Sequence, residues 1–446
     1  MLMAYRLPAL LVMGLSCGPA FGQDITDFTL DNGLQVVVIE DHRAPIVTDM
    51  VWYKTGSADE KAGESGVAHF LEHLMFQGTQ KMAPGEFSAT VSALGGSDNA
   101  FTSYDYTAYF QRVSADNLER MLTMEADRME NLDLSQPIVD NERQVILQER
   151  SQRVDSNPSS LFQEQLSAAQ YLNSPYQSPV IGWRAEMEAL SREDALDHYH
   201  TFYAPNNAIL VVAGDVTPDG VRELATRHFG PLSPSTTIPP RERPQEPPQL
   251  AERRIVFKDA RVAQPYVMRS YLAPERNAGD QKSAAALTVL AELLGGEPTN
   301  SVLAKSMQFG ADAPAIYTMA SYDGTSVDQT TFNIAAVPAE GTTIQEVENA
   351  MDATLQTFLK DGVDQTQLDR IKTQLRASDI YARDDADGLA RMYGSALAVG
   401  LTVQDVKDWP QILQDVTADE VMAAAQSVLD KRQSVTGWLE SDEVTQ

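Results

Sequence analysis

Two histidines and a glutamate lie within one short stretch of the chain, His69-Phe70-Leu71-Glu72-His73. Residues four apart on an α-helix lie one above the other, so the imidazoles of His69 and His73 can both face one Zn²⁺ ion. Glu72 lies on nearly the same side of the helix. There its carboxylate can take a proton from a zinc-bound water and pass it to a leaving amine. The pattern therefore predicts a hydrolytic zinc site in which Glu72 is the catalytic base.

The alternative interpretation is that these residues belong to an ordinary helix surface, because an acidic chain carries glutamate in many places. Histidine is scarce, however, with 6 in the whole chain, so a chance match at both histidine positions is rare. The order H-x-x-E-H is the reverse of the commoner H-E-x-x-H, and it is typical of the inverzincin peptidases. The motif thus favours peptidase chemistry.

Two histidines leave a catalytic zinc site one ligand short, since three protein ligands and a water are usual. The segment Asp140–Arg150 (DNERQVILQER) carries Glu142 and Glu149, whose spacing is close to two helical turns, so both project from one helix face. One carboxylate can bind zinc while the other hydrogen-bonds a ligand. A solvated helix has the same spacing, and the spacing alone does not decide between these interpretations.

The composition is that of a globular protein with more than one domain. The chain has 446 residues, enough for two or three domains, and 43% of them are hydrophobic. The formal net charge of −29 argues against nucleic acid as a partner, because phosphate binding needs clustered Lys and Arg. Such a charge keeps a protein soluble, although it also suits basic or extended peptides as ligands.

The N-terminus has the pattern of an export signal over residues 1–22. Arg6 supplies a basic region, residues 7–15 (LPALLVMGL) an apolar one, and residues 20–22 the small side chains that a signal peptidase recognises. We expect cleavage before Gln23 and export, in a bacterium to the periplasm. The apolar region is too short to span a bilayer, and no later segment is apolar enough to form a transmembrane helix.

The one cysteine, Cys17, lies inside this signal. It is a possible acceptor for a lipid anchor, but Gly14-Leu15-Ser16 before it fits a lipoprotein signal poorly, so simple cleavage is preferred. The mature chain then has no cysteine, which excludes disulfides and thiol catalysis.

A proline-rich stretch divides the chain. Residues 231–250 have no hydrophobic periodicity and are predicted to be an extended linker. It separates an N-terminal zinc-binding domain, residues 23–230, from a C-terminal domain, residues 251–446.

The sequence on one side of this linker is weakly repeated on the other. Residues 35–47 resemble residues 254–267, and both read as strands leading into a central sheet. The acidic helix and following strand of residues 190–212 resemble those of residues 416–438. Only two copies are present, so the repeat predicts a duplicated α+β domain and not a solenoid.

The second copy lacks the polar residues of the first. When Ser65–Gly78 is aligned with Ser283–Gly296, the positions of His69, Glu72 and His73 are taken, in that order, by Leu287, Leu290 and Ala291. The fold therefore does not require these three polar side chains, and we expect the C-terminal domain to have no zinc site.

The segment Gly63–Thr79, which reads G-x-x-G-x-A-H-F-L-E-H-L-M-F-Q-G-T, together with the downstream glutamates, resembles the pitrilysin/insulinase family. The likeness is to short-chain members such as the mitochondrial and bacterial processing peptidases. It implies Zn²⁺ as cofactor and Glu149, 76 residues after His73, as third ligand beside His69. Glu142 would then support the ligands. It also implies a mixed, largely antiparallel sheet covered by helices in each domain, with the two domains forming half of a clamshell.

The same resemblance assigns a substrate strand. Residues 95–102 (GGSDNAFT) are similar to an edge strand beside the zinc, and Asn99, Ala100 and Phe101 would contact an extended peptide. The unpaired N–H and C=O groups of an edge strand can bind a peptide backbone. A glycine-led hairpin with a purely structural role is the alternative, and the two are compatible.

The family also polarises its substrate with an Arg/Tyr pair from the second domain. Tyr317 stands at the tyrosine position, but Asn300–Tyr317 contains no arginine and only one cation, Lys305. Lysine lacks the planar fork of arginine. We therefore expect a heterodimer in which a zinc-less homologous subunit supplies the pair, with a homodimer as the alternative.

These features together predict a zinc-dependent endopeptidase that hydrolyses short or unfolded peptides inside a closed chamber. The alternative is a non-catalytic assembly or peptide-binding subunit that keeps the fold and the zinc. Glu72 argues against it, because a structural zinc site needs no base beside its ligands.

Overall fold

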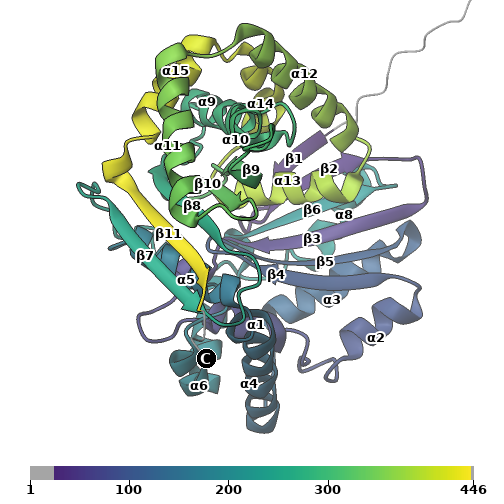
Figure 1. Ribbon diagram of the computed structural model, residues 1–446. Coiled ribbons are helices and arrows are strands. Elements are labelled where there is room, and N and C mark those ends of the chain that lie inside the picture. The colour runs from purple at the N-terminus through teal and green to yellow at the C-terminus, as the bar shows by residue number, and fades with distance from the viewer. Residues whose placement is uncertain (1–24, 443–446) are drawn as a thin grey trace, which may run out of the picture.

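The computed structural model describes residues 25–442, which form two β-sheets surrounded by helices (Figure 1). The predicted signal peptide, residues 1–22, and Cys17 lie outside the described residues. Within the described part of the chain, no helix combines the length and apolar character that a membrane crossing needs.

The first sheet has six strands in the order β1-β2-β6-β3-β5-β4. Their bounds are β1 Ile25–Thr29, β2 Gln35–Glu40, β3 Ile46–Tyr53, β4 Ser97–Thr102, β5 Thr107–Ser114 and β6 Ala208–Gly214. β2 and β6 are parallel, and all other neighbours are antiparallel. Every residue of β6 (AILVVAG) is buried, as expected for a central strand with both faces covered.

The second sheet repeats this arrangement with five strands in the order β7-β11-β8-β10-β9. Their bounds are β7 Arg253–Asp259, β8 Tyr266–Ala273, β9 Ala315–Tyr322, β10 Thr330–Pro338 and β11 Ser434–Ser441. The parallel pair, β7 and β11, occupies the place of β2 and β6 in the first sheet. The predicted fold of two homologous α+β halves with mixed, largely antiparallel sheets is therefore confirmed.

Helices occupy the segments between the strands. Those of the first half are α1 Val67–Leu74, α2 Glu86–Ala93, α3 Leu118–Glu130, α4 Gln136–Arg150, α5 Pro158–Gln170, α6 Arg184–Ala189, α7 Arg192–Phe202 and α8 Pro218–His228. Those of the second half are α9 Lys282–Ala291, α10 Val302–Met307, α11 Ile344–Asp361, α12 Gln365–Ala382, α13 Ala386–Ala398, α14 Val403–Asp415 and α15 Ala418–Val428. Residues 231–250 form no helix or strand; the predicted domain boundaries stay a prediction.

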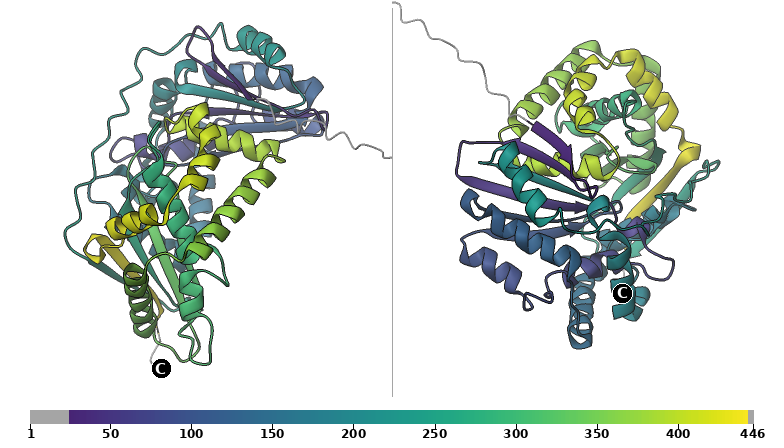
Figure 2. Two further views of the ribbon diagram at one scale, coloured as in Figure 1. Left: turned by 90° about the horizontal axis from the view of Figure 1, so that it is seen from above. Right: turned by 180° about the vertical axis from the view of Figure 1, so that it is seen from behind.

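Each half contributes helical residues that cover the sheet of the other. Helices of the first half, including α1 and α3, cover one face of the first sheet, while α13 from the second half packs on β2, β3 and β6 from the other side. In return, α5 of the first half packs on β7, β8 and β11. Figure 2 shows the two sheets and these crossing helices from above and from behind. Because each sheet is completed by the other half, we expect the two halves to fold as one unit.

A substitution at Gly394 of α13 tests the packing of this helix on the first sheet, because Gly394 lies directly against Trp52 of β3. A Cβ atom at residue 394 would lie 2.1 Å from Cε2 of Trp52, whose side chain is 1% exposed. We expect G394A to lower the free energy of unfolding by about 1–3 kcal/mol through overpacking. Urea denaturation measures the loss. In the same helix, G388A meets only the flexible carboxylate of Asp385 and is the control; an equal loss in both variants would contradict the prediction.

Candidate active site

Helix α1 carries the H-x-x-E-H motif, and its apolar residues fix which side of it faces outward. Val67, Phe70, Leu71 and Leu74 are buried in the core of the first half. The helix begins after Gly66, whose φ of 90° is left-handed; a Cβ there would lie 2.6 Å from the carbonyl oxygen of Ile181. With one side anchored in this way, the motif residues lie on the side away from the core.

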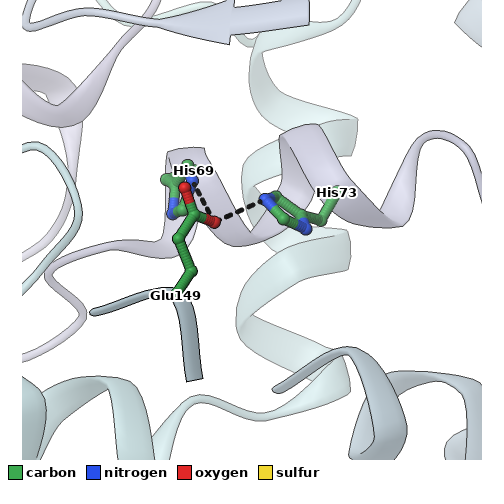
Figure 3. Close-up of side chains that lie close together, drawn as sticks. All are labelled: His69, His73 and Glu149. Atoms are coloured by element: carbon green, nitrogen blue, oxygen red, sulfur yellow. Dashed lines mark ion pairs between the residues drawn. The ribbon is translucent and has the colours of Figure 1, made fainter. Parts of the chain in front are cut away.

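The structure brings His69, His73 and Glu149 together as predicted (Figure 3). Nε2 of His73 lies 3.2 Å and Nε2 of His69 lies 3.6 Å from Oε2 of Glu149. One donor atom from each residue lies within 4.8 Å of the others. Ligand atoms about 2.0–2.1 Å from a tetrahedral zinc ion lie roughly 3.3 Å apart, so the two distances to Glu149 are close to those of a zinc site, and the donor types suit Zn²⁺.

Glu142 lies behind the cluster, on the far side of one imidazole. Its Oε1 lies 3.0 Å from Nδ1 of His73, and its Oε2 accepts a hydrogen bond of 2.9 Å from the side-chain amide of Gln77. A carboxylate on the second nitrogen of a ligand histidine fixes the ring and its tautomer. Nδ1 of His69 is buried and has no such partner within residues 25–442. The geometry therefore suits Glu149 as a ligand and Glu142 as the support of His73.

The ionisable groups of the cluster shift one another's pKa values. Burial lowers the pKa of His69 to about 4, and the neighbouring His73 acts in the same direction. Burial also lowers the pKa of His73, but hydrogen bonds to Glu142 and Glu149 outweigh it and raise the value to about 9. The hydrogen bond from His73 lowers the pKa of Glu149. Zinc ligation requires neutral imidazoles, and the pKa of His73 is raised, so metal binding and proton release are linked here.

Glu72 lies on the same helix but outside the cluster of donors. Its Oε2 accepts a hydrogen bond of 2.6 Å from the hydroxyl of Thr102, at the end of β4. Burial raises the pKa of Glu72, and the hydrogen bond from Thr102 opposes the rise. A carboxylate with a raised pKa is better matched to proton transfer near neutral pH.

The predicted substrate strand is an edge strand, since β4 pairs only with β5 in the described sheet. Along it, Ala100 packs against the core that contains α1, whereas Phe101 packs on the opposite face, edge-on to Trp52. The side chain of Asn99 accepts a hydrogen bond from the backbone N–H of Ala100. The contact of Asn99, Ala100 and Phe101 with substrate stays a prediction.

Tyr317 is not brought to the cluster. It lies on the edge strand β9, opposite Val337 of β10, and is 49% exposed. Among the described residues it makes no hydrogen bond with His69, His73 or Glu149. Its predicted role in polarising substrate therefore stays a prediction.

Three side chains that the sequence did not predict touch the site residues. Gln77 holds Glu142, the hydroxyl of Thr102 holds Glu72, and Nη1 of Arg153 lies 2.8 Å from Oε1 of Glu149. Gln77 and Arg153 stand four residues after a predicted ligand, a spacing that brings side chains together on a helix and that could have identified both. Arg153 lies in a π-helical turn, Ser151–Asp155, that continues α4; such turns are frequent at functional sites.

Comparison with known proteins identifies the family. Residues 35–183 match the family described as Insulinase (Peptidase family M16), and residues 189–375 match the Peptidase M16 inactive domain. The chain belongs to peptidase family M16, as its resemblance to the insulinase family predicted.

Individual relatives agree with this assignment. Zinc protease PqqE of Helicobacter pylori is 30% identical over 414 residues, which cover 92% of this chain and 91% of the relative. The mitochondrial-processing peptidase subunit beta of Bos taurus is 33% identical over 201 residues, 45% of this chain and 41% of the relative. The crystal structure of a protease from Helicobacter pylori superposes with a TM-score of 0.85 at 29% identity, covering 94% of this chain and 99% of that one. The chain is therefore a metallopeptidase by family, with the half-clamshell fold of its relatives.

Proposed function

We propose that this protein is a zinc-dependent endopeptidase whose Zn²⁺ is held by His69, His73 and Glu149. The observation that carries the proposal is the cluster itself, with its donor atoms within 4.8 Å of one another and Glu72 between the two histidines on α1. A carboxylate beside such a cluster, held by Thr102 but not among the donors, is what a hydrolytic site needs and a structural one does not. The zinc protease among its relatives supports the same metal.

Zinc bound at this cluster would lower the pKa of a water molecule and polarise the scissile carbonyl. Glu72 would accept the proton of the attacking water on Oε1, because Oε2 is engaged by the Thr102 hydroxyl. The same carboxyl would then donate that proton to the leaving amine. Glu142 would keep His73 in the orientation and tautomer that leave Nε2 free.

The proposed substrates are short or unfolded peptides. An extended segment can add to the free edge of β4 through backbone hydrogen bonds. Thr102, at the end of β4, contacts Glu72, so a peptide bound along this edge would have its scissile bond near Glu72. Since the chain is half of a clamshell, a second subunit would supply the other half, close the chamber and exclude folded proteins. The relative named as a subunit beta supports a heterodimer with a zinc-less homologue that supplies an Arg/Tyr pair; a homodimer that uses Tyr317 is the alternative. The N-terminal pattern supports export, in a bacterium to the periplasm.

Cleavage of a quenched, unstructured peptide by the purified mature chain, with zinc measured on the same sample, tests the proposal. We expect turnover that a chelator removes and added zinc restores. Zinc occupancy without turnover would point to the missing second subunit, and a zinc-less homologue should then restore activity. A chain that neither binds zinc nor cuts the peptide, with or without such a homologue, would overturn the proposal.

A further inference from the structure

The first turn of α1 is held by carboxylates from outside the helix. Oε2 of Glu60 accepts a hydrogen bond from the backbone N–H of Gly66, and Oε1 accepts one from the N–H of Ala68, both at 2.9 Å. Glu186 of α6 accepts a third, from the N–H of Ser65 at 2.9 Å. The N-terminal N–H groups of a helix have no partner inside it, and Gly66 at the cap has no side chain to offer. Glu60 therefore takes over the capping of the helix that carries the motif.

Because both carboxylate oxygens of Glu60 accept hydrogen bonds from its backbone, α1 is fixed in direction as well as at its N-terminal end. The helix has only 8 residues, so it is too short to be stable by itself and takes its orientation from its contacts. Ala68 directly precedes His69, so the atoms that Glu60 holds are next in the chain to a predicted ligand. Its acidic side chain also lies at the end where the helix dipole favours negative charge.

The loop that presents Glu60 is itself anchored. The preceding residue, Asp59, is 2.8 Å from Nη2 of Arg243 in the linker segment and 3.2 Å from Nη2 of Arg241. Arg243 is nearly buried and also pairs with Asp328 of the second half at 3.0 Å. The residue next to Glu60 thus belongs to a group of ion pairs that connects the first half, the linker segment and the second half.

We propose that Glu60 is a positioning residue for the metal centre, which holds the first turn of α1 so that His69 and His73 meet Glu149 at one point. The inference rests on the proposed function, because it takes these three residues as zinc ligands. Glu60 lies outside the ligand set and would act only through the backbone of α1.

The replacement of Glu60 by glutamine tests the contact that its two oxygens make with the backbone of α1. Burial raises the pKa of Glu60 to about 8, and the hydrogen bonds from Ala68 and Gly66 oppose the rise. Glutamine keeps the shape and one acceptor, but its NH₂ group would face a backbone N–H. One of the two contacts must therefore be lost, and α1 is free to tilt about the other.

We expect E60Q to weaken zinc binding about 10- to 100-fold, the range found when groups that orient metal ligands are removed. Zinc affinity would be measured by competition with a chromogenic chelator, and Co²⁺ absorption would report the ligand geometry. E64Q is the matched control: Glu64 lies four residues further on, and its carboxylate pairs only weakly with Lys61, at 3.9 Å. We expect wild-type affinity and spectrum for E64Q.

Thermal unfolding of the metal-free variants separates positioning from stability. A lower melting temperature in E60Q with unchanged zinc affinity and Co²⁺ spectrum of the folded protein would overturn the proposal. If E60Q does not fold, E186A decides, because it removes the acceptor of the Ser65 N–H and leaves both contacts of Glu60 in place; a smaller loss of zinc affinity supports the proposal and none overturns it. Wild-type protein that binds no zinc would instead refute the proposed function.

Discussion

Replacing Glu72 with glutamine is expected to lower kcat for a quenched peptide by about 10²- to 10⁴-fold while zinc stays bound. Glutamine has the size of glutamate, and its carbonyl oxygen can still accept the hydrogen bond from Thr102. It cannot accept a proton from water at neutral pH. Because Glu72 lies outside the donor cluster, the zinc content of E72Q should equal that of the wild type.

The matched control is E130Q, the same change at the exposed last residue of α3 in the same half. Its kcat and zinc content should both be those of the wild type. Chelator-sensitive turnover by E72Q at the wild-type rate would show that another group moves the proton. Loss of zinc together with activity would show that Glu72 binds the metal.

The sequence predicted the parts of this site that depend on local spacing. His69 and His73 come together because they stand one above the other on α1, which is a property of any helix. The spacing of Glu142 and Glu149 places both on one face of α4 but does not say which one reaches the metal. The proposed choice of Glu149 rests on geometry: its Oε2 lies near both imidazoles, whereas Glu142 contacts only one of the two, at Nδ1 of His73.

Contacts between distant segments were beyond the sequence analysis. The hold of Glu60 on Ala68 and the hydrogen bond from Thr102 to Glu72 depend on how loops and strands meet in the folded chain. The exchange of α5 and α13 between the halves was missed for a related reason. An amphipathic helix shows that it will be buried, but its pattern does not show which sheet it will cover.

Glu149→Gln and Glu142→Gln are expected to affect zinc binding to very different extents. E142Q should weaken zinc binding about 10- to 100-fold, because it loosens the ring of His73 without removing a donor. E149Q should weaken it much more, because a neutral amide replaces the anionic oxygen that faces both imidazoles. The loss should also release Arg153 from its ion pair. Zinc content after dialysis against a chelator series, and the zinc concentration that restores peptide cleavage, measure both effects.

The order of these two effects decides the assignment of the third ligand. Both variants remove one carboxylate charge from the same helix, so a general electrostatic effect on zinc would be similar in the two. A larger loss in E142Q than in E149Q would exchange the roles of the two glutamates. Equal losses would mean that zinc is held mainly by the histidines, and the predicted set of His69, His73 and Glu149 would be wrong. Only a ligand at Glu149 gives a much larger loss there, because its Oε2 lies 3.2 Å and 3.6 Å from the two Nε2 atoms that would share the ion.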